Sequence, residues 1–405
     1  MQSHQVRNTM SIKKFIQEHL NDNTDKLLLN ASRYPGIDVP YAVCQISARR
    51  QIKDKLPSWF ANDDIIYPSR LSTEQCSSET TARYKQRLII GDCICDLTGG
   101  LGIDSYYFAP KAKKVIYIER FPDYCAAATS NFHVLGINNI EIQNADAKKL
   151  INTLKADTFY IDPARRADGN KRVFALTDCE PDVLQLKPIL LENARRIIVK
   201  ISPMADIDET LRLLPETSEV HILSVKNECK ELLFVLENNL FIPQNQVTVH
   251  AVNYDTNGNC QVFTFTPEEE KTAELHATAT IQKYLYEPHA ALLKSGAFKL
   301  TAIRFGLQKL HRHSHLYTSD TICPDFPGRR FIVHDIFEFS GKLLKQLHKT
   351  IPQANLTTRN FNLSVADLRK RSGIREGGDI YLLATTLNNN QQVLLSCRKV
   401  NSSQP

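Results

Sequence analysis

The sequence contains no C-x-x-C pair, although it has ten cysteines among its 405 residues. Apart from Cys93 and Cys95 the cysteines stand singly, so neither a cysteine metal cluster nor a disulfide framework is expected. The chain also lacks an apolar run of membrane-spanning length, and its first residues lack the apolar core of a signal peptide. We therefore expect a protein of the reducing cytoplasm, with neither a membrane nor a metal among its partners.

The most informative segment begins at residue 92. An apolar strand ends in Asp96, a turn containing Gly99, Gly100 and Gly102 follows, and a helix and a second strand lead to Glu119. Glycines let the backbone turn tightly and approach a ligand closely, because they carry no Cβ. An acid at the end of the second strand can accept hydrogen bonds from a ribose. The segment therefore predicts the first half of a nucleotide-binding βαβ unit.

Three interpretations of this turn compete. A dinucleotide site has the pattern G-x-G-x-x-G, and here Ser105 replaces the third glycine. An S-adenosylmethionine site has an acid at the strand end followed by small residues, which the run from Asp96 to Gly102 provides, with Thr98 in place of the first glycine. A plain strand–turn–helix without a ligand is the third interpretation.

Acids also follow the next two predicted strands. The strand Ile140–Gln143 leads to Asp146, and the strand Thr158–Ile161 leads directly to Asp162. Together with Asp96 they place acids at the carboxyl ends of successive strands, where open α/β sheets bind their ligands. This spacing favours an open α/β sheet with one ligand crevice.

With these motifs the chain resembles the class I S-adenosylmethionine-dependent methyltransferases, which implies a Rossmann-like α/β sheet. The run Asp162-Pro163-Ala164-Arg165 is similar to their fourth motif, usually Asp/Asn-Pro-Pro and an aromatic residue. In amino-group methyltransferases of that kind, the first side chain and the following carbonyl receive the substrate amine. Ala164 and Arg165 depart from the motif, which leaves Arg165 to stack through its guanidinium or to hold a phosphate.

The same four residues also resemble the fourth motif of RNA uracil-C5 methyltransferases, which need a cysteine nucleophile after the next strand. The predicted strand Arg196–Ile201 is followed by no cysteine, so methylation of a base nitrogen is expected instead. The resemblance implies that the catalytic residues are Asp162, Pro163 and Arg165. It implies that the cofactor, S-adenosylmethionine, is held by Asp96, Leu97, Thr98, Gly99, Gly100, Gly102, Glu119, Arg120, Asp146, Ala147 and Asp162.

Positive charge is concentrated in the last third of the chain. From residue 281 to the end there are 18 Lys and Arg against 8 Asp and Glu, a charge of +10, whereas the preceding residues carry −4. This asymmetry indicates a polyanionic partner. A further cation cluster follows the fourth motif in a polar loop, where it is expected to grip phosphates (Arg165, Arg166, Lys171 and Arg172). Five more cations are expected along one helical stretch: Lys294, Lys299, Arg304, Lys309 and Arg312.

The last segment, Phe331 to Val400, reads strand–helix–strand–helix–hairpin, and with the run around Tyr286 it resembles the THUMP-like region of bacterial class I methyltransferases. Such modules imply an RNA substrate, either rRNA or tRNA. Three parts are expected: a helical N-terminal region over residues 1–82, a methyltransferase domain over 83–275 and a basic α/β, THUMP-like domain over 276–405.

Two other function classes stay open. A catalytically silent RNA-binding protein would keep the cofactor fold as a scaffold, as the altered fourth motif allows. A nicotinamide-dependent oxidoreductase is disfavoured by Ser105 and by the lack of an evident catalytic Tyr–Lys or His–Asp pair. The alternating histidines His311, His313 and His315 are interpreted as a basic or hydrogen-bonding surface, because no nearby ligand completes a metal shell.

Overall fold

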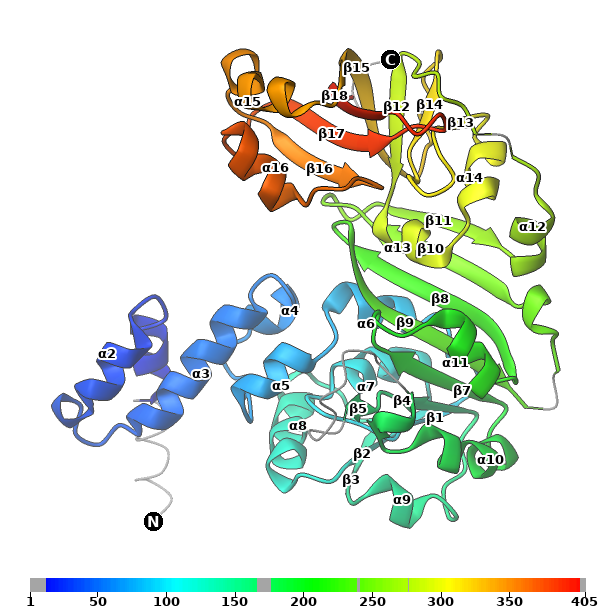
Figure 1. Ribbon diagram of the computed structural model, residues 1–405. Helices are drawn as coiled ribbons and strands as arrows, with labels where there is room; N and C mark the ends of the chain where they lie inside the picture. The colour runs from blue at the N-terminus through cyan, green and yellow to red at the C-terminus, as the bar shows by residue number, and fades with distance from the viewer. Residues whose placement is uncertain (1–11, 166–175, 239–240, 276, 401–405) are drawn as a thin grey trace, which may run out of the picture. The chain divides into compact units, whose positions relative to one another are not determined.

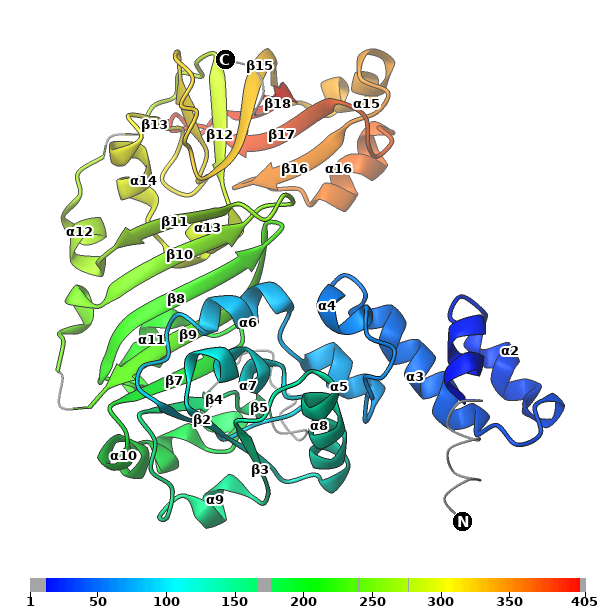
Figure 2. The same cartoon turned by 180° about the vertical axis from the view of Figure 1, so that it is seen from behind.

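The computed structural model describes residues 12–165, 176–238, 241–275 and 277–400. The chain divides into two compact units, Met1–Ser218 with Leu233–Phe241 and Glu219–Leu232 with Ile242–Pro405 (Figures 1 and 2). The three-part division expected from the sequence stays a prediction. In the described ranges, no helix combines the length and the apolar character needed to cross a bilayer.

The first unit begins with short helices, as the sequence predicts. After a helical segment at residues 12–18 come α2 (Thr24–Leu29), η1 (Ala31–Arg33), α3 (Val39–Ile52), α4 (Pro57–Phe60), α5 (Arg70–Gln75) and α6 (Glu79–Lys85). Trp59 of α4 is fully buried in a core that also contains Leu101 of the glycine-rich turn and Tyr107. The helical region thus packs directly on the nucleotide-binding segment.

The α/β part of the first unit follows the predicted alternation. Its elements are β1 (Cys93–Asp96), α7 (Ile103–Phe108), η2 (Ala109–Lys111), β2 (Lys114–Glu119), α8 (Pro122–Val134), β3 (Ile140–Asn144), α9 (Ala147–Leu150), β4 (Thr158–Ile161), β5 (Ala164–Arg165), η3 (Leu176–Asp178), β6 (Cys179–Glu180), α10 (Val183–Asn193), β7 (Arg196–Ile201) and α11 (Ile207–Leu213). Every residue of β4 is buried, as expected for a parallel strand covered on both faces.

The order of these strands places the ligand crevice. They run β7-β4-β1-β2-β3, and each neighbouring pair is parallel. Strand β1 lies between β2 and β4, so the chain crosses over in opposite directions on its two sides. Such a switch point is where open α/β sheets bind ligands. Asp96 is in register with Tyr160, which brings the turn after β1 beside the residues that follow β4.

The second unit contains long strands and a second sheet. Strands β8 (Thr217–Val225) and β9 (Glu228–Glu237) span both units, and η4 (Gln244–Gln246), β10 (Thr248–Tyr254), β11 (Cys260–Phe265) and α12 (Pro267–Thr272) follow. Then come β12 (Tyr284–Pro288), α13 (Ala290–Ser295), α14 (Phe298–Arg304), β13 (Gln308–Lys309), β14 (Tyr317–Ser319), β15 (Gly328–Glu338), α15 (Gly341–Thr350), β16 (Asn355–Arg359), α16 (Val365–Ser372), β17 (Ile380–Thr386) and β18 (Gln392–Lys399). The predicted alternation after Phe331 is confirmed.

The second sheet has the order β13-β14-β12-β15-β18-β17-β16. Helices α15 and α16 lie side by side, as both views show (Figures 1 and 2), and their apolar faces pack with β17 and β18 around Leu344, Leu347 and Leu368. The predicted single helical stretch from Lys294 to Arg312 is wrong. Gly296 adopts a left-handed conformation that ends α13, and the chain then forms α14 and β13.

Candidate active site

A cavity of about 530 Å³ opens at the carboxyl ends of β1, β2 and β4, entirely within the first unit. Helix α5 and the end of β7 complete its wall. Among the predicted site residues, ten line it: Leu97, Thr98, Gly99, Gly100, Gly102, Glu119, Arg120, Asp146, Ala147 and Asp162. Asp96 and Pro163 do not belong to the described lining. The side chain of Arg165 and the predicted cation cluster at residues 166–172 lie outside the described residues.

Two glycines of the glycine-rich turn lie so close to aromatic rings that there is no room for a Cβ. A Cβ at Gly99 would lie 2.2 Å from the ring of Tyr117, and a Cβ at Gly102 would lie 2.7 Å from the ring of Phe132. Gly102 also has a φ of +86°, which residues with a side chain rarely adopt. The turn is therefore held against β2 and α8, and only glycine fits these two positions.

Asp96 lies beneath the turn. Its two carboxylate oxygens accept hydrogen bonds from the Thr98 amide, at 3.0 Å, and from the Ser105 hydroxyl, at 2.7 Å. Burial raises the pKa of Asp96 to about 7, against the opposing effect of the Ser105 hydroxyl. Ser105, whose presence disfavours a dinucleotide site, thus fixes the acid that holds the turn. The predicted contact between Asp96 and the cofactor stays a prediction.

Glu119 ties the end of β2 to the same turn. One of its carboxylate oxygens accepts the Gly100 amide and the other accepts the Phe121 amide, each at 2.9 Å. The Tyr117 hydroxyl donates to the Gly100 carbonyl at 2.6 Å. A carboxylate has about four acceptor positions, so Glu119 can accept further hydrogen bonds while it holds the turn.

Asp162 lies beside the turn through a contact that the sequence does not predict. The hydroxyl of Thr98 accepts the Asp162 amide at 2.7 Å, which explains a side chain where a glycine is usual. The ammonium of Lys200, at the end of β7, lies 2.5 Å from Oδ2 of Asp162. Lys200 lines the cavity. Its position near the end of a predicted strand is the one feature of the sequence that indicates a place in the site.

A buried charged network supports the floor of the cavity and was also missed. Lys85 is fully buried, and its ammonium lies 2.7 Å from Oδ1 of Asp104. The hydroxyls of Ser77 and Tyr160 donate to Oδ2 of Asp104 at 2.8 and 2.9 Å. Burial would raise the pKa of Asp104, but the ammonium groups of Lys85 and Lys200 outweigh it and hold the pKa below its ordinary value. Its members come from α6 and the segment before it, from α7 and from β4, so their spacing along the chain does not predict the network.

The end of the cavity near Asp146 contains charges of both signs. Asp146 accepts the Lys148 amide at 3.0 Å and caps α9. Glu180 lies 3.4 Å from the Lys148 ammonium and 3.6 Å from the Arg120 guanidinium. Both cations therefore face an acid inside the lining, and this end of the cavity does not present an unbalanced positive charge.

The chain is similar to several known proteins. A crystal structure described as a "putative methyltransferase" from Porphyromonas gingivalis W83 is 41% identical, with a TM-score of 0.87 over 96% of this chain and 98% of that one. Residues 284–327 match a family described as a ferredoxin-like domain, and residues 328–399 match one described as THUMP domain-like. An uncharacterized RNA methyltransferase of Oceanobacillus iheyensis is 28% identical over 130 residues, which are 31% of this chain and 26% of that protein. That match spans about a quarter of the curated relative.

Proposed function

The chain belongs to the same methyltransferase family as the Porphyromonas gingivalis protein, and from that membership we propose that it transfers a methyl group from S-adenosylmethionine to a base nitrogen in structured RNA, either rRNA or tRNA. One observation carries the proposal. A single cavity is lined by a glycine-rich turn, by two acids near strand ends, and by an ion pair between Asp162 after β4 and Lys200 of β7. These are the parts that a nucleoside cofactor and an amino acceptor require.

The residues of the cavity fit the cofactor. A volume of about 530 Å³ lies in the range of small-molecule sites, and the glycine-rich turn leaves its wall open where a Cβ would intrude. Glu119 would accept the ribose hydroxyls, and Asp146 would accept the adenine amino group. When bound, S-adenosylmethionine supplies an electrophilic methyl group.

Asp162 would orient the acceptor. Its Oδ2 is paired with Lys200, so Oδ1 is the oxygen that would accept a hydrogen from the amino group of the base. That hydrogen bond turns the nitrogen lone pair toward the methyl group, and the Pro163 carbonyl would accept the second hydrogen. Most of the rate gain would come from this orientation. Lys200 would act as a positioning residue, because it fixes the carboxylate that touches the substrate.

The RNA part of the proposal rests on the THUMP domain-like match, on the name of the Oceanobacillus relative and on the charge of α15 and α16. The two helices pack through their leucines, so their opposite faces are solvent-exposed. The two helices carry five exposed cations: Lys342, Lys345, Lys349, Lys370 and Arg371. Such a surface can bind phosphates by counterion release without reading the sequence.

The test is methyl transfer from radiolabelled S-adenosylmethionine to unmodified rRNA and tRNA transcripts, with cofactor binding measured in parallel by calorimetry. We expect Asp162→Ala to lose transfer while the cofactor still binds, and Glu119→Ala to lose cofactor binding. Asp208→Ala removes an exposed carboxylate of α11 and serves as the matched control. Loss of cofactor binding in Asp162→Ala would make that residue structural.

A scaffold protein without transferase activity is the second candidate. One observation favours it: Ala164 and Arg165 form a short strand paired with β6, where amino methyltransferases carry proline and an aromatic ring. It predicts RNA binding with a steep dependence on salt and no transfer to any transcript. The same assay therefore separates the two.

A further inference from the structure

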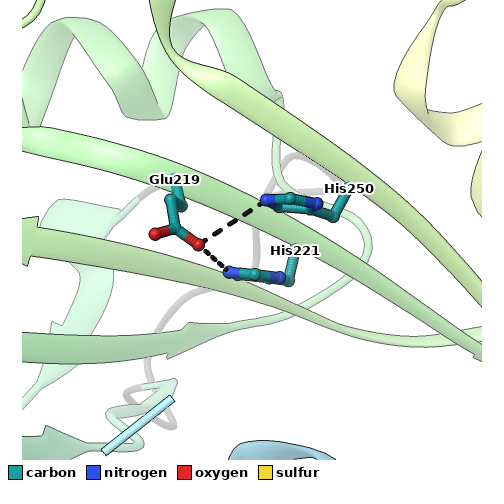
Figure 3. A group of neighbouring side chains, drawn as sticks. All are labelled: Glu219, His221 and His250. Atoms are coloured by element: carbon teal, nitrogen blue, oxygen red, sulfur yellow. Dashed lines mark hydrogen bonds and ion pairs between the residues drawn. The ribbon is translucent and has the colours of Figure 1, made fainter. Parts of the chain in front are cut away.

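Three side chains converge on strands β8 and β10, at a place that the proposed methyl transfer does not use. Glu219 and His221 are two residues apart on β8 and therefore point to the same face. His250 of β10 is the register partner of His221. Figure 3 shows the carboxylate of Glu219 directed at both imidazoles, whose rings stack with centroids 4.5 Å apart. All three residues belong to the second unit.

The separations match those of metal ligands. Nε2 of His221 lies 3.0 Å from Oε2 of Glu219, and Nε2 of His250 lies 3.6 Å from the same oxygen. Two ligands of a tetrahedral zinc ion, each bound at about 2.1 Å, are separated by about 3.4 Å. Available donor atoms on all three residues lie within 4.8 Å of one another. In the described part of the chain, no other group of three or more His, Cys, Asp or Glu meets this condition.

The surroundings prepare the imidazole of His250 for a metal. Its Nδ1 lies 2.9 Å from the hydroxyl of Thr264, the register partner on β11. If Nδ1 donates to that hydroxyl, Nε2 carries the lone pair that a metal needs, and histidine ligands usually have such a second contact. The side chain of His221 is 4% exposed, while those of His250 and Glu219 are 21% and 36% exposed, so the cluster is open to solvent on one side.

We propose that Glu219, His221 and His250 bind one Zn²⁺ ion, with a water molecule as the fourth ligand. Two imidazoles and one carboxylate form a donor set that zinc accepts readily. The rings are nearly parallel, at 8°, so one of them must tilt to aim its lone pair at the ion. His250 is the more exposed of the two and is the ring that tilts. The ion joins β8 to β10 and stabilises the second unit.

The alternating histidines do not offer a comparable site. His311 Nδ1 receives the His313 amide and lies 3.0 Å from the Asn360 amide nitrogen, while His315 stacks on Phe298 at 3.6 Å. Their rings thus serve different partners. The sequence predicts no metal because closely spaced ligand residues, such as C-x-x-C pairs, are absent. The proposed ligands are far apart in the chain and come together only because β8 pairs with β10.

The full chain, freed of metal with a chelator and checked for folding by circular dichroism, is titrated with Co²⁺ by visible absorbance and with Zn²⁺ by calorimetry. We expect one equivalent of each metal to bind, and tetrahedral cobalt bands without a thiolate charge-transfer band. We expect His250→Ala to weaken binding at least about 100-fold and Thr264→Val about 10-fold, the latter as an outer contact. Zinc should raise the melting temperature of the wild type but not of His250→Ala.

Two controls make the outcome decisive. His334→Ala removes an exposed histidine of β15, and His313→Ala removes one of the alternating histidines; both should bind zinc as the wild type does. His250 is only partly buried, so its replacement leaves the strands intact, and Glu219→Gln provides a second variant. The proposal is overturned if the wild type binds neither metal, or if His250→Ala and Glu219→Gln both bind zinc as tightly as the wild type. It is also overturned if His313→Ala, rather than His250→Ala, abolishes binding.

Discussion

The two units use charge in opposite ways. In the first unit the charged residues around the cavity are paired with each other: the buried Lys85 with Asp104, and the partly buried Lys200 with Asp162. In the second unit, whose sequence is strongly basic, the cations divide into two groups. Some are partly buried and already paired, such as Arg329 and Arg359, which both contact the buried carboxylate of Glu287. Others cover α15 and α16 in solvent. Net charge alone therefore overstates the surface available to a polyanion.

Lys309 adds to the positive charge of the second unit but is not available to a polyanionic partner. It was expected among the cations that face the partner, but its side chain is buried and donates to the carbonyls of His311 and Arg312 at 2.7 and 2.6 Å. Burial lowers its pKa to about 8. A cation in this position stabilises a loop and contributes little to phosphate binding.

The largest effect is expected where a buried pair of the first unit is broken. Lys85→Met leaves the carboxylate of Asp104 buried without its cation, which should lower the free energy of unfolding by about 3–5 kcal/mol. Urea denaturation measures it. Lys113→Met, which breaks an exposed pair with Asp92, should leave the unfolding midpoint unchanged. An equal response of the two variants would remove the contrast between buried and exposed charge.

Asp96 should give the first unit a dependence of stability on pH. Its folded pKa of about 7 exceeds the unfolded value near 4, so between these values the folded protein keeps a proton that the unfolded chain releases. The free energy of unfolding should therefore fall as pH rises from about 4 to 7, by up to about 4 kcal/mol, and Asp96→Asn should remove that fall. Urea titrations across this range measure it, with Asp208→Asn as the control.

Lys200 should separate catalysis from cofactor binding. Lys200→Met frees the carboxylate of Asp162 to rotate, so kcat should fall about 30-fold while the Kd for S-adenosylmethionine stays unchanged. Lys200→Arg should restore part of the rate, because it keeps the cation. Steady-state kinetics and calorimetry give the two quantities. A parallel loss of cofactor affinity would show that the lysine only supports the cavity wall.

The smallest effect is expected on the surface of the second unit. Replacing Lys342, Lys345 and Lys349 of α15 by glutamine should weaken RNA binding about 10-fold and reduce the salt slope of the affinity by about 2 to 3, one unit for each lost phosphate contact. Filter binding at several salt concentrations measures both. The matched control replaces three exposed lysines of the first unit (Lys111, Lys113 and Lys114). If both triple variants respond alike, the basic helices are not the docking face.

Most of the fold was predictable because its signals are local. The strands of the α/β part are short apolar runs that end in an acid, and the bounds of β4 and β7 match the prediction residue for residue. The helical stretch after Lys294 was misjudged because one glycine, Gly296, ends a helix that the spacing of the cations would allow to continue. The spacing of cations is therefore a weaker predictor of where a helix ends than a glycine in the left-handed conformation.

The glycine-rich turn, the acids at the strand ends and the alternation of elements in both units follow from local sequence patterns, because each depends on residues close together in the chain. The pairs that charged and polar side chains form depend instead on how distant strands lie side by side. Parallel pairing of β4 with β1 and β7 brings Thr98, Asp162 and Lys200 together, and pairing of β8 with β10 brings His221 beside His250. Hydrogen bonding between strands that are distant in the chain brings these side chains together, and local sequence patterns do not predict which strands pair.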